Sequence, residues 1–149
     1  MGDDIIISIY GLQFPEDGED DEVELITAGS YYKKDGCYYI SYEESELTGM
    51  DGTTTTLKVE DERVTMTRTG LVSTELIFEK GRKHVSFYET NLGALTVGVN
   101  AHVVRSKLDD SGGDVEVDYS VEIDHEVAGQ NVFRINVRRT EESGWKAKS

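Results

Sequence analysis

The sequence predicts an all-β domain, an antiparallel meander that closes into a β-barrel of about 8–10 strands. Apolar residues recur at every second position along most of the chain, which is the period of a half-buried strand. Fifteen glycines and short polar turns separate these segments, and one proline, Pro15, interrupts the backbone. Short connections favour antiparallel neighbours, because parallel pairing needs long crossovers. The length of 149 residues suits a single domain, residues 1–149.

Ten segments show this alternation and are therefore predicted as strands. They are residues 5–9, 23–31, 38–42, 57–59, 64–66, 76–78, 83–90, 95–103, 115–123 and 133–137. The segment 83–90 is ambiguous, because Val85 and Phe87 lie on the face opposite His84 and Tyr88. A meander of this length has to hide its edge strands, and closure into a barrel hides them best. After the last segment, we expect residues 138–149 to form a frayed tail.

The stretch MDGTTTTLKVEDERVTMTRTG, residues 50–70, is predicted to be a hairpin despite its four consecutive threonines. If Glu60 faces Arg63 across the turn, Val59 pairs with Val64 and Thr55 pairs with Arg68. The opposite face then carries threonine pairs, and such cross-strand pairs contribute roughly 0.2–1 kcal/mol each. The threonines are therefore expected to be strand residues and not a low-complexity linker.

The charge balance excludes two classes of partner. The chain has 15 basic and 30 acidic residues, for a formal net charge of −15. Such a surface repels nucleic acid and anionic membranes, so we expect neither as a partner. The charge keeps a β-rich protein soluble, or it attracts a basic partner or a cation. The acidic runs 16–24 and 109–114 lack the alternating ligand spacing of a calcium loop, and we expect both to be solvated loops.

The sequence carries no signature of a cofactor or a metal site. The three histidines are scattered and lack the spacing of metal ligands. The single cysteine, Cys37, cannot form an internal disulfide, which fits a reducing compartment. No run approaches the roughly 20 apolar residues of a membrane-spanning helix. We therefore expect a cytoplasmic protein without a membrane anchor, a metal or a cofactor.

Two stretches carry a resemblance to a known family, YYISYEESELTGMDGTTTTLKVEDERVTMTRTG at 38–70 and YETNLGAL at 88–95. They contain an aromatic-rich strand ending in Tyr-Glu, a Gly-x-x-x-Thr-x-Lys hairpin, a strand closing in Arg-x-Gly, and a Tyr-x-Thr-x-x-Gly turn. On these motifs the chain resembles the bacterial YwiB-like proteins, a family of unknown function in the calycin, or lipocalin-like, barrel class. The resemblance implies a lipocalin-like β-barrel and implies no reaction.

Arg68 is the centre of the candidate site, because it is in phase with the inward residues of its strand. An inward arginine needs a partner, since an unpaired buried charge costs several kcal/mol. Glu44 is a candidate partner, and the hydroxyls of Tyr42, Tyr88 and Thr90 complete the predicted ligand-binding cluster. The alternative is a structural plug, in which Arg68 and Glu44 neutralise each other at the barrel end or Arg68 reaches solvent.

These observations leave two main functional hypotheses. The first is a non-enzymatic binding protein that holds a small apolar or amphipathic, anionic ligand in the barrel. The second is an interaction module with a side-chain-filled barrel that binds another protein or its own copy as a homo-oligomer; an enzyme has the least support. The interior separates the two main hypotheses, and the side chains expected to fill it are Met66, Phe78, Phe87, Val99, Tyr119 and Phe133.

Overall fold

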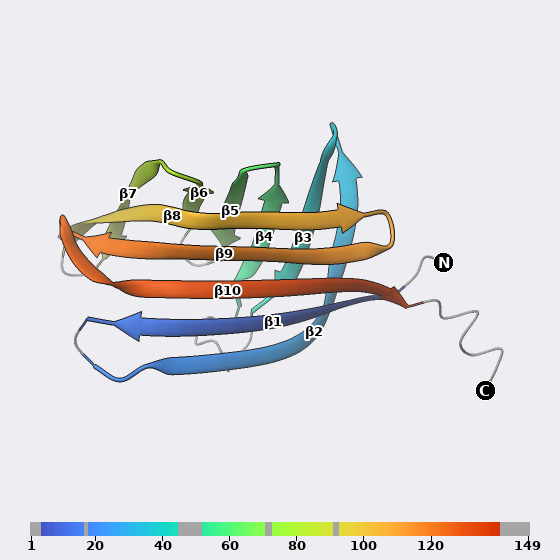
Figure 1. Ribbon diagram of the computed structural model, residues 1–149, viewed down its shortest axis with the longest axis horizontal. Helices are drawn as coiled ribbons and strands as arrows, with labels where there is room; N and C mark the ends of the chain where they lie inside the picture. The colour runs from blue at the N-terminus through green and yellow to red at the C-terminus, as the bar shows by residue number, and fades with distance from the viewer. Residues whose placement is uncertain (1–3, 17, 45–51, 71–72, 91–92, 141–149) are drawn as a thin grey trace.

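The fold is all-β, as the alternating pattern predicts. The computed structural model describes residues 4–16, 18–44, 52–70, 73–90 and 93–140, and these contain ten strands (Figure 1). The strands are β1 (Asp4–Pro15), β2 (Asp21–Lys34), β3 (Cys37–Glu43), β4 (Thr54–Val59), β5 (Arg63–Thr69), β6 (Thr74–Glu79), β7 (Lys83–Thr90), β8 (Gly93–Asp109), β9 (Gly112–Ile123) and β10 (Glu126–Thr140). Each predicted segment lies within one of these strands. Among the described residues, no helix is long and apolar enough to span a membrane.

The strands form one antiparallel sheet in the order β6-β5-β4-β3-β2-β1-β10-β9-β8-β7. The first strand pairs with the last, so that Ile7 lies opposite Val137. The two ends of the sheet, β6 and β7, meet without a continuous ladder. Side chains join them: the Ser86 hydroxyl donates to the Glu75 carbonyl at 3.0 Å, and His84 Nε2 lies 2.9 Å from Glu79 Oε1. The sheet is thus nearly closed into a barrel.

The sheet is folded into two layers whose strands cross (Figure 1). One layer holds β1, β8, β9, β10 and the first half of β2, and the other holds β3 to β6. β2 belongs to both, because Asp21–Ala28 pair with β1 and Gly29–Lys34 pair with β3. Gly29 lies at this change of partner, and a Cβ there would collide with the Ser41 carbonyl oxygen and Ile7 Cδ1. Glycine therefore lets the two layers approach closely.

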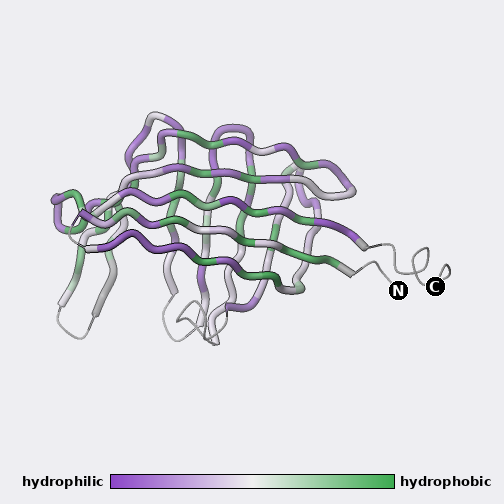
Figure 2. The backbone as a smooth tube through the Cα atoms, turned by 60° about the horizontal axis from the view of Figure 1, so that its bottom comes forward, coloured by the Kyte–Doolittle hydropathy of each residue, from purple (hydrophilic) through white to green (hydrophobic). Residues whose placement is uncertain are grey.

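The hairpin of β4 and β5 has the predicted register. Val59 pairs with Val64, and Thr55 pairs with Arg68. The Glu60 amide donates to the Arg63 carbonyl at 2.8 Å, and their side chains form an ion pair at 3.0 Å. Figure 2 shows how hydrophilic and hydrophobic residues alternate along the strands of both layers. This alternation fixes the register of the hairpin, because a shift by one residue would turn the apolar side chains to the solvent.

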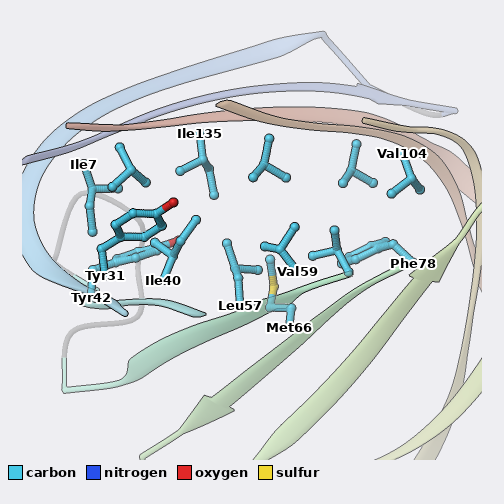
Figure 3. Packing of buried hydrophobic residues seen from close by; sticks show 14 of the residues in the cluster. Ile7, Tyr31, Ile40, Tyr42, Leu57, Val59, Met66, Phe78, Val104 and Ile135 are labelled. Atoms are coloured by element: carbon cyan, nitrogen blue, oxygen red, sulfur yellow. The ribbon is translucent and has the colours of Figure 1, made fainter. Parts of the chain in front are cut away.

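Apolar side chains from the two layers fill the barrel interior (Figure 3). Met66, Phe78 and Val99 are buried, as predicted, and Tyr119 and Phe133 pack against this core. The Phe78 ring lies 4.6 Å from the Tyr119 ring and 5.5 Å from the Phe133 ring, centroid to centroid. The interior is therefore mostly occupied by the protein's own side chains.

Three sequence-based expectations are wrong in part. Phe87 does not fill the interior; it is 76% exposed, because the inward positions of β7 are those of His84 and Ser86. The tail begins later than expected, since β10 continues to Thr140. The acidic runs are not entirely loops, because β2 begins at Asp21 and β9 at Gly112. Residues 141–149 lie outside the described part of the chain.

Arg139, within the expected tail, closes one end of the barrel. Its Nε donates to the Asp110 carbonyl at 2.6 Å, and its guanidinium lies 5.2 Å from the centre of the Tyr31 ring. The Tyr31 hydroxyl donates to the Asp109 carbonyl at 2.6 Å, and the Tyr38 hydroxyl donates to Asp110 Oδ1 at 2.7 Å. These bonds tie the β2–β3 hairpin, the β8–β9 turn and the end of β10 together. The end of the barrel that carries Tyr42 and Arg68 is called the mouth below.

Candidate functional site

The site is built from one row of residues across three neighbouring strands. Tyr42 of β3 pairs with Thr55 of β4, and Thr55 pairs with Arg68 of β5. All three are in phase with the buried residues of their strands, so they face inward. Glu44 follows directly after β3, where its amide donates to the Thr53 carbonyl at 2.8 Å. The structure thus brings Tyr42, Glu44 and Arg68 together, as the sequence predicts.

Thr55 lies at the centre of this cluster. Its hydroxyl donates to Glu44 Oε2, and it also accepts a long hydrogen bond of 3.4 Å from Arg68 Nε. The same Nε lies 3.8 Å from Glu44 Oε2. The Glu44 side chain is 2% exposed, whereas the Arg68 side chain is 26% exposed. The carboxylate is therefore fixed inside the barrel, and the guanidinium lies between it and the mouth.

Burial sets the protonation of Tyr42. Loss of hydration raises the pKa of the Tyr42 phenol well above its ordinary value; the negative charge of Glu44 raises it further, and the positive charge of Arg68 opposes this. The phenol therefore stays neutral and acts as a hydrogen-bonding group. It cannot serve as a base in the neutral pH range.

The raised pKa of Tyr42 predicts a loss of stability in alkali. Above about pH 10 the unfolded chain releases this proton while the folded chain retains it, so the free energy of unfolding falls as pH rises through that range. We expect Tyr42→Phe to show a smaller fall between about pH 8 and about pH 11 than the parent protein, measured by urea unfolding.

The matched control for this prediction is Tyr32→Phe, which removes a hydroxyl from an exposed ring. It should leave the alkaline fall in stability as large as in the parent. An equal fall in the parent protein and in Tyr42→Phe would contradict the prediction.

A cavity of about 140 Å³ opens beside this cluster at the mouth of the barrel. It is lined by Ile9, Gly11, Leu12, Gln13, Tyr42, Met66, Arg68, Leu76, Tyr119, Asn131, Val132, Phe133 and Ile135. Asn131 Nδ2 donates to the Tyr119 hydroxyl at 3.2 Å, so polar groups from β9 and β10 face the cavity opposite Arg68. Polar groups from β1, β3, β5, β9 and β10 thus converge on a small space.

Sequence reasoning missed several of these polar groups. Thr55 is in phase with Leu57 and Val59, and this signal places it inside the barrel. Gln13 and Asn131 are likewise in phase with the inward residues of their strands, but only the pairing of β1 with β10 brings them to this cavity. The side chains of Tyr88 and Thr90, which were predicted to join the cluster, lie outside what the structure describes, although both residues belong to β7.

The arrangement provides one cation, hydroxyl groups and amide groups around a partly apolar cavity. These groups suit the recognition of a carboxylate or a similar anion. Among the described residues, no three or more His, Cys, Asp or Glu side chains are grouped as metal ligands. Two of the three histidines instead form pairwise contacts: His84 with Glu79 at 2.9 Å, and His102 with Ser120 at 3.2 Å.

Comparisons with known proteins agree with the fold. The crystal structure of the YwiB protein from Bacillus subtilis superposes with a TM-score of 0.79 at 23% identity, covering 93% of this chain and 92% of that one. At the level of sequence, the uncharacterized β-barrel protein YwiB of Bacillus subtilis strain 168 is 28% identical over 111 residues, which are 74% of this chain and 77% of that protein.

The family assignment comes from the model of a domain of unknown function, DUF1934, which matches residues 7–135. This range includes β2 to β9 in full, most of β1 and β10, and the whole Arg68 cluster. Because the match covers most of the chain, the resemblance predicted from the sequence motifs is confirmed. The protein belongs to the DUF1934 family of YwiB-like β-barrel proteins, whose function is not established.

Proposed function

We propose that the protein is a binding protein that holds a small anionic group at the mouth of its barrel. The observation that carries this proposal is the position of Arg68. Within the described part of the chain, both of its polar contacts use Nε and Arg68 lines the cavity, and the proposal assigns its two terminal nitrogens to the ligand. A guanidinium presents paired donors that match a carboxylate.

The size of the cavity restricts the ligand. Pockets for drug-sized molecules measure about 300–1,000 Å³, whereas this one measures about 140 Å³. At about 30 Å³ per water molecule, it holds only a few waters or one small group. The interior does not take up the apolar body of an amphipathic ligand. Such a ligand would place its anionic head group beside Arg68 and its remaining atoms outside the mouth.

Glu44 does not prevent this binding. Charge-assisted hydrogen bonds between guanidinium and carboxylate measure about 2.7–2.9 Å, and the 3.8 Å between Arg68 Nε and Glu44 Oε2 is longer. The carboxylate instead accepts the Thr55 hydroxyl. Glu44 therefore balances the charge of Arg68 inside the barrel while leaving its outer nitrogens to a ligand.

Removing Arg68 tests the proposal. In Arg68→Met, we expect loss of the chemical-shift changes that acetate, sulfate and decanoate cause in residues around the cavity in NMR titrations. The variant should also lose about 1–3 kcal/mol of unfolding free energy, because the buried Glu44 loses its counter-charge; partial exposure of Arg68 keeps this below the value for a fully buried pair.

Two further variants separate binding from stability. Lys58→Met removes a cation from the outer face of β4 and should leave the titrations unchanged. The double variant Glu44→Gln/Arg68→Met removes both charges, so it should recover stability without recovering binding. If Arg68→Met is destabilised but still binds each anion like the parent, the cluster is a structural plug and the proposal is wrong.

A second candidate is an interaction module, and the filled interior favours it. Core side chains fill the interior and limit the cavity, whereas some large apolar side chains lie on the outside of the barrel, including Phe87 and Ile26. Native mass spectrometry of freshly purified protein compares the two candidates, because it reports a co-purified small molecule and a protein partner in one measurement. A bare monomer would count against both.

A further inference from the structure

Among the described residues, the first half of β2 has a strand neighbour on one side only, and we call its other side the β2 edge. Asp21–Ala28 pair with β1 on one side, and β3 joins β2 only from Gly29 onward. Within the described part of the chain, no backbone hydrogen bond satisfies the other side of this segment. At about 3.3 Å per residue, the β2 edge is about 26 Å long. Figure 1 shows this part of β2 at the border of its layer.

The opposite border of the same layer carries another such edge with a different charge. Beyond Ala101, β8 pairs only with β9, and its exposed residues there include Arg105 and Lys107. Basic side chains commonly protect an edge strand from pairing with other chains. This edge also faces a groove that contains Asp61 and Glu62, so opposite charges already lie close to its basic residues.

At the β2 edge, Asp21, Glu22 and Glu24 are exposed. Arg134 lines the same groove as Glu24, but the acidic side chains form no ion pair with a described residue. Glu22 instead accepts the Tyr10 hydroxyl at 2.6 Å. Glu22, Glu24 and Ile26 lie on the same face of β2. The side chains on that face of an incoming strand would contact these three residues in turn.

Ile26 adds an apolar contact at the same edge. Its side chain is 71% exposed, which is unusual for an edge strand that has to stay unpaired. Beside it lies a shallow groove of about 650 Å³, bordered by Ser8, Tyr10 and Arg134 across β1 and β10. The edge therefore combines acidic side chains and an apolar surface with backbone groups that no described residue pairs.

We propose that the Asp21–Ala28 edge of β2 binds an extended, lysine- or arginine-rich segment of another protein as an additional strand. Backbone hydrogen bonds supply the affinity, and pairing of basic residues with Glu22 and Glu24 supplies the specificity. A second copy of this chain fits less well, because it carries the same formal charge of −15 and an equally acidic β2. This surface is distinct from the Arg68 cavity, so the inference does not depend on anion binding there.

A synthetic peptide of about ten residues that alternates lysine and valine provides the probe. We expect it to bind at about 0.15 M salt, and we expect Glu22→Lys/Glu24→Lys to weaken binding about tenfold, from the loss of two favourable cross-strand pairs and the gain of two repulsive ones. Hydrogen exchange followed by mass spectrometry should show that the peptide protects the amides of residues 21–28.

The matched control is Asp61→Lys/Glu62→Lys, which changes the net charge equally at the exposed β4–β5 turn. It should bind the peptide within about twofold of the parent. Circular dichroism and thermal unfolding show whether each variant is folded. Equal weakening by both double variants, protection outside residues 21–28, or a dimer of the parent that Glu22→Lys/Glu24→Lys dissociates would each overturn the proposal. None of these outcomes alters the anion titrations at Arg68.

Discussion

Phe78→Ala will lower the free energy of unfolding by about 3–5 kcal/mol. Phe78 is fully buried where β6 meets β9 and β10, and its ring contacts the rings of Tyr119 and Phe133. Alanine removes the buried ring, leaves a cavity between the two layers, and takes away the shared partner of the two remaining rings. For a domain at the lower end of ordinary stability, about 5 kcal/mol, a loss at the upper end of this range leaves a large unfolded population.

Phe87→Ala is the matched control, because it makes the same chemical change at a side chain that is 76% exposed. Urea unfolding followed by circular dichroism should show a change within about 0.5 kcal/mol for this variant, with an unchanged denaturant dependence for both. Equal losses for the two variants would mean that Phe78 is not the centre of the core.

Gly113→Ala will prevent stable folding or lower the free energy of unfolding by more than about 3 kcal/mol. Gly113 has a φ of +144°, a backbone conformation that side-chain-bearing residues rarely adopt. It also lies between two neighbours, since it pairs with Leu108 of β8 and with Val137 of β10. A Cβ at this position would collide with the backbone carbonyl oxygen of Lys107. The backbone at Gly113 pairs with β8 on one side and with β10 on the other, so moving it away from the collision would disrupt both ladders.

Gly81→Ala separates the collision from the conformational cost. Gly81 also has a positive φ, +75°, but a Cβ there meets nothing within 4 Å. This variant should lose only about 1–2 kcal/mol, the cost of the left-handed conformation alone. Thermal unfolding of both variants provides the comparison, and similar melting temperatures would show that the β8–β9–β10 ladder tolerates a side chain at Gly113.

The strands and their inward faces were predictable because the alternation is strong and local. In the hairpin of β4 and β5, one assumption about the turn gave the register of Thr55 with Arg68, and the structure has that register. Glu44 was predictable as the partner of Arg68 for the same reason, since both lie in phase with buried residues of nearby strands. Local periodicity thus specified the half of the site that comes from consecutive strands.

The other half of the cavity was not predictable in this way. Gln13, Tyr119 and Asn131 face Arg68 only because β1 pairs with β10 and the sheet curls back on itself. Nothing in a single strand reveals which distant strand will lie across the barrel. Phe87 was misplaced because both faces of β7 carry large side chains, so its alternation does not specify which face is buried.

The pairing of the first strand with the last has a consequence for synthesis. β1 leaves the ribosome before the strands β2 to β9, and its partner β10 is made only after all of these. Until then β1 has β2 on one side and an unsatisfied ladder on the other. Closure between residues as distant as Ile7 and Val137 costs entropy before any contact is gained, which places the protein among β domains that fold in milliseconds to seconds. A nascent chain that stops before β10 would expose β1 to pairing with other chains, so the last strand protects the first.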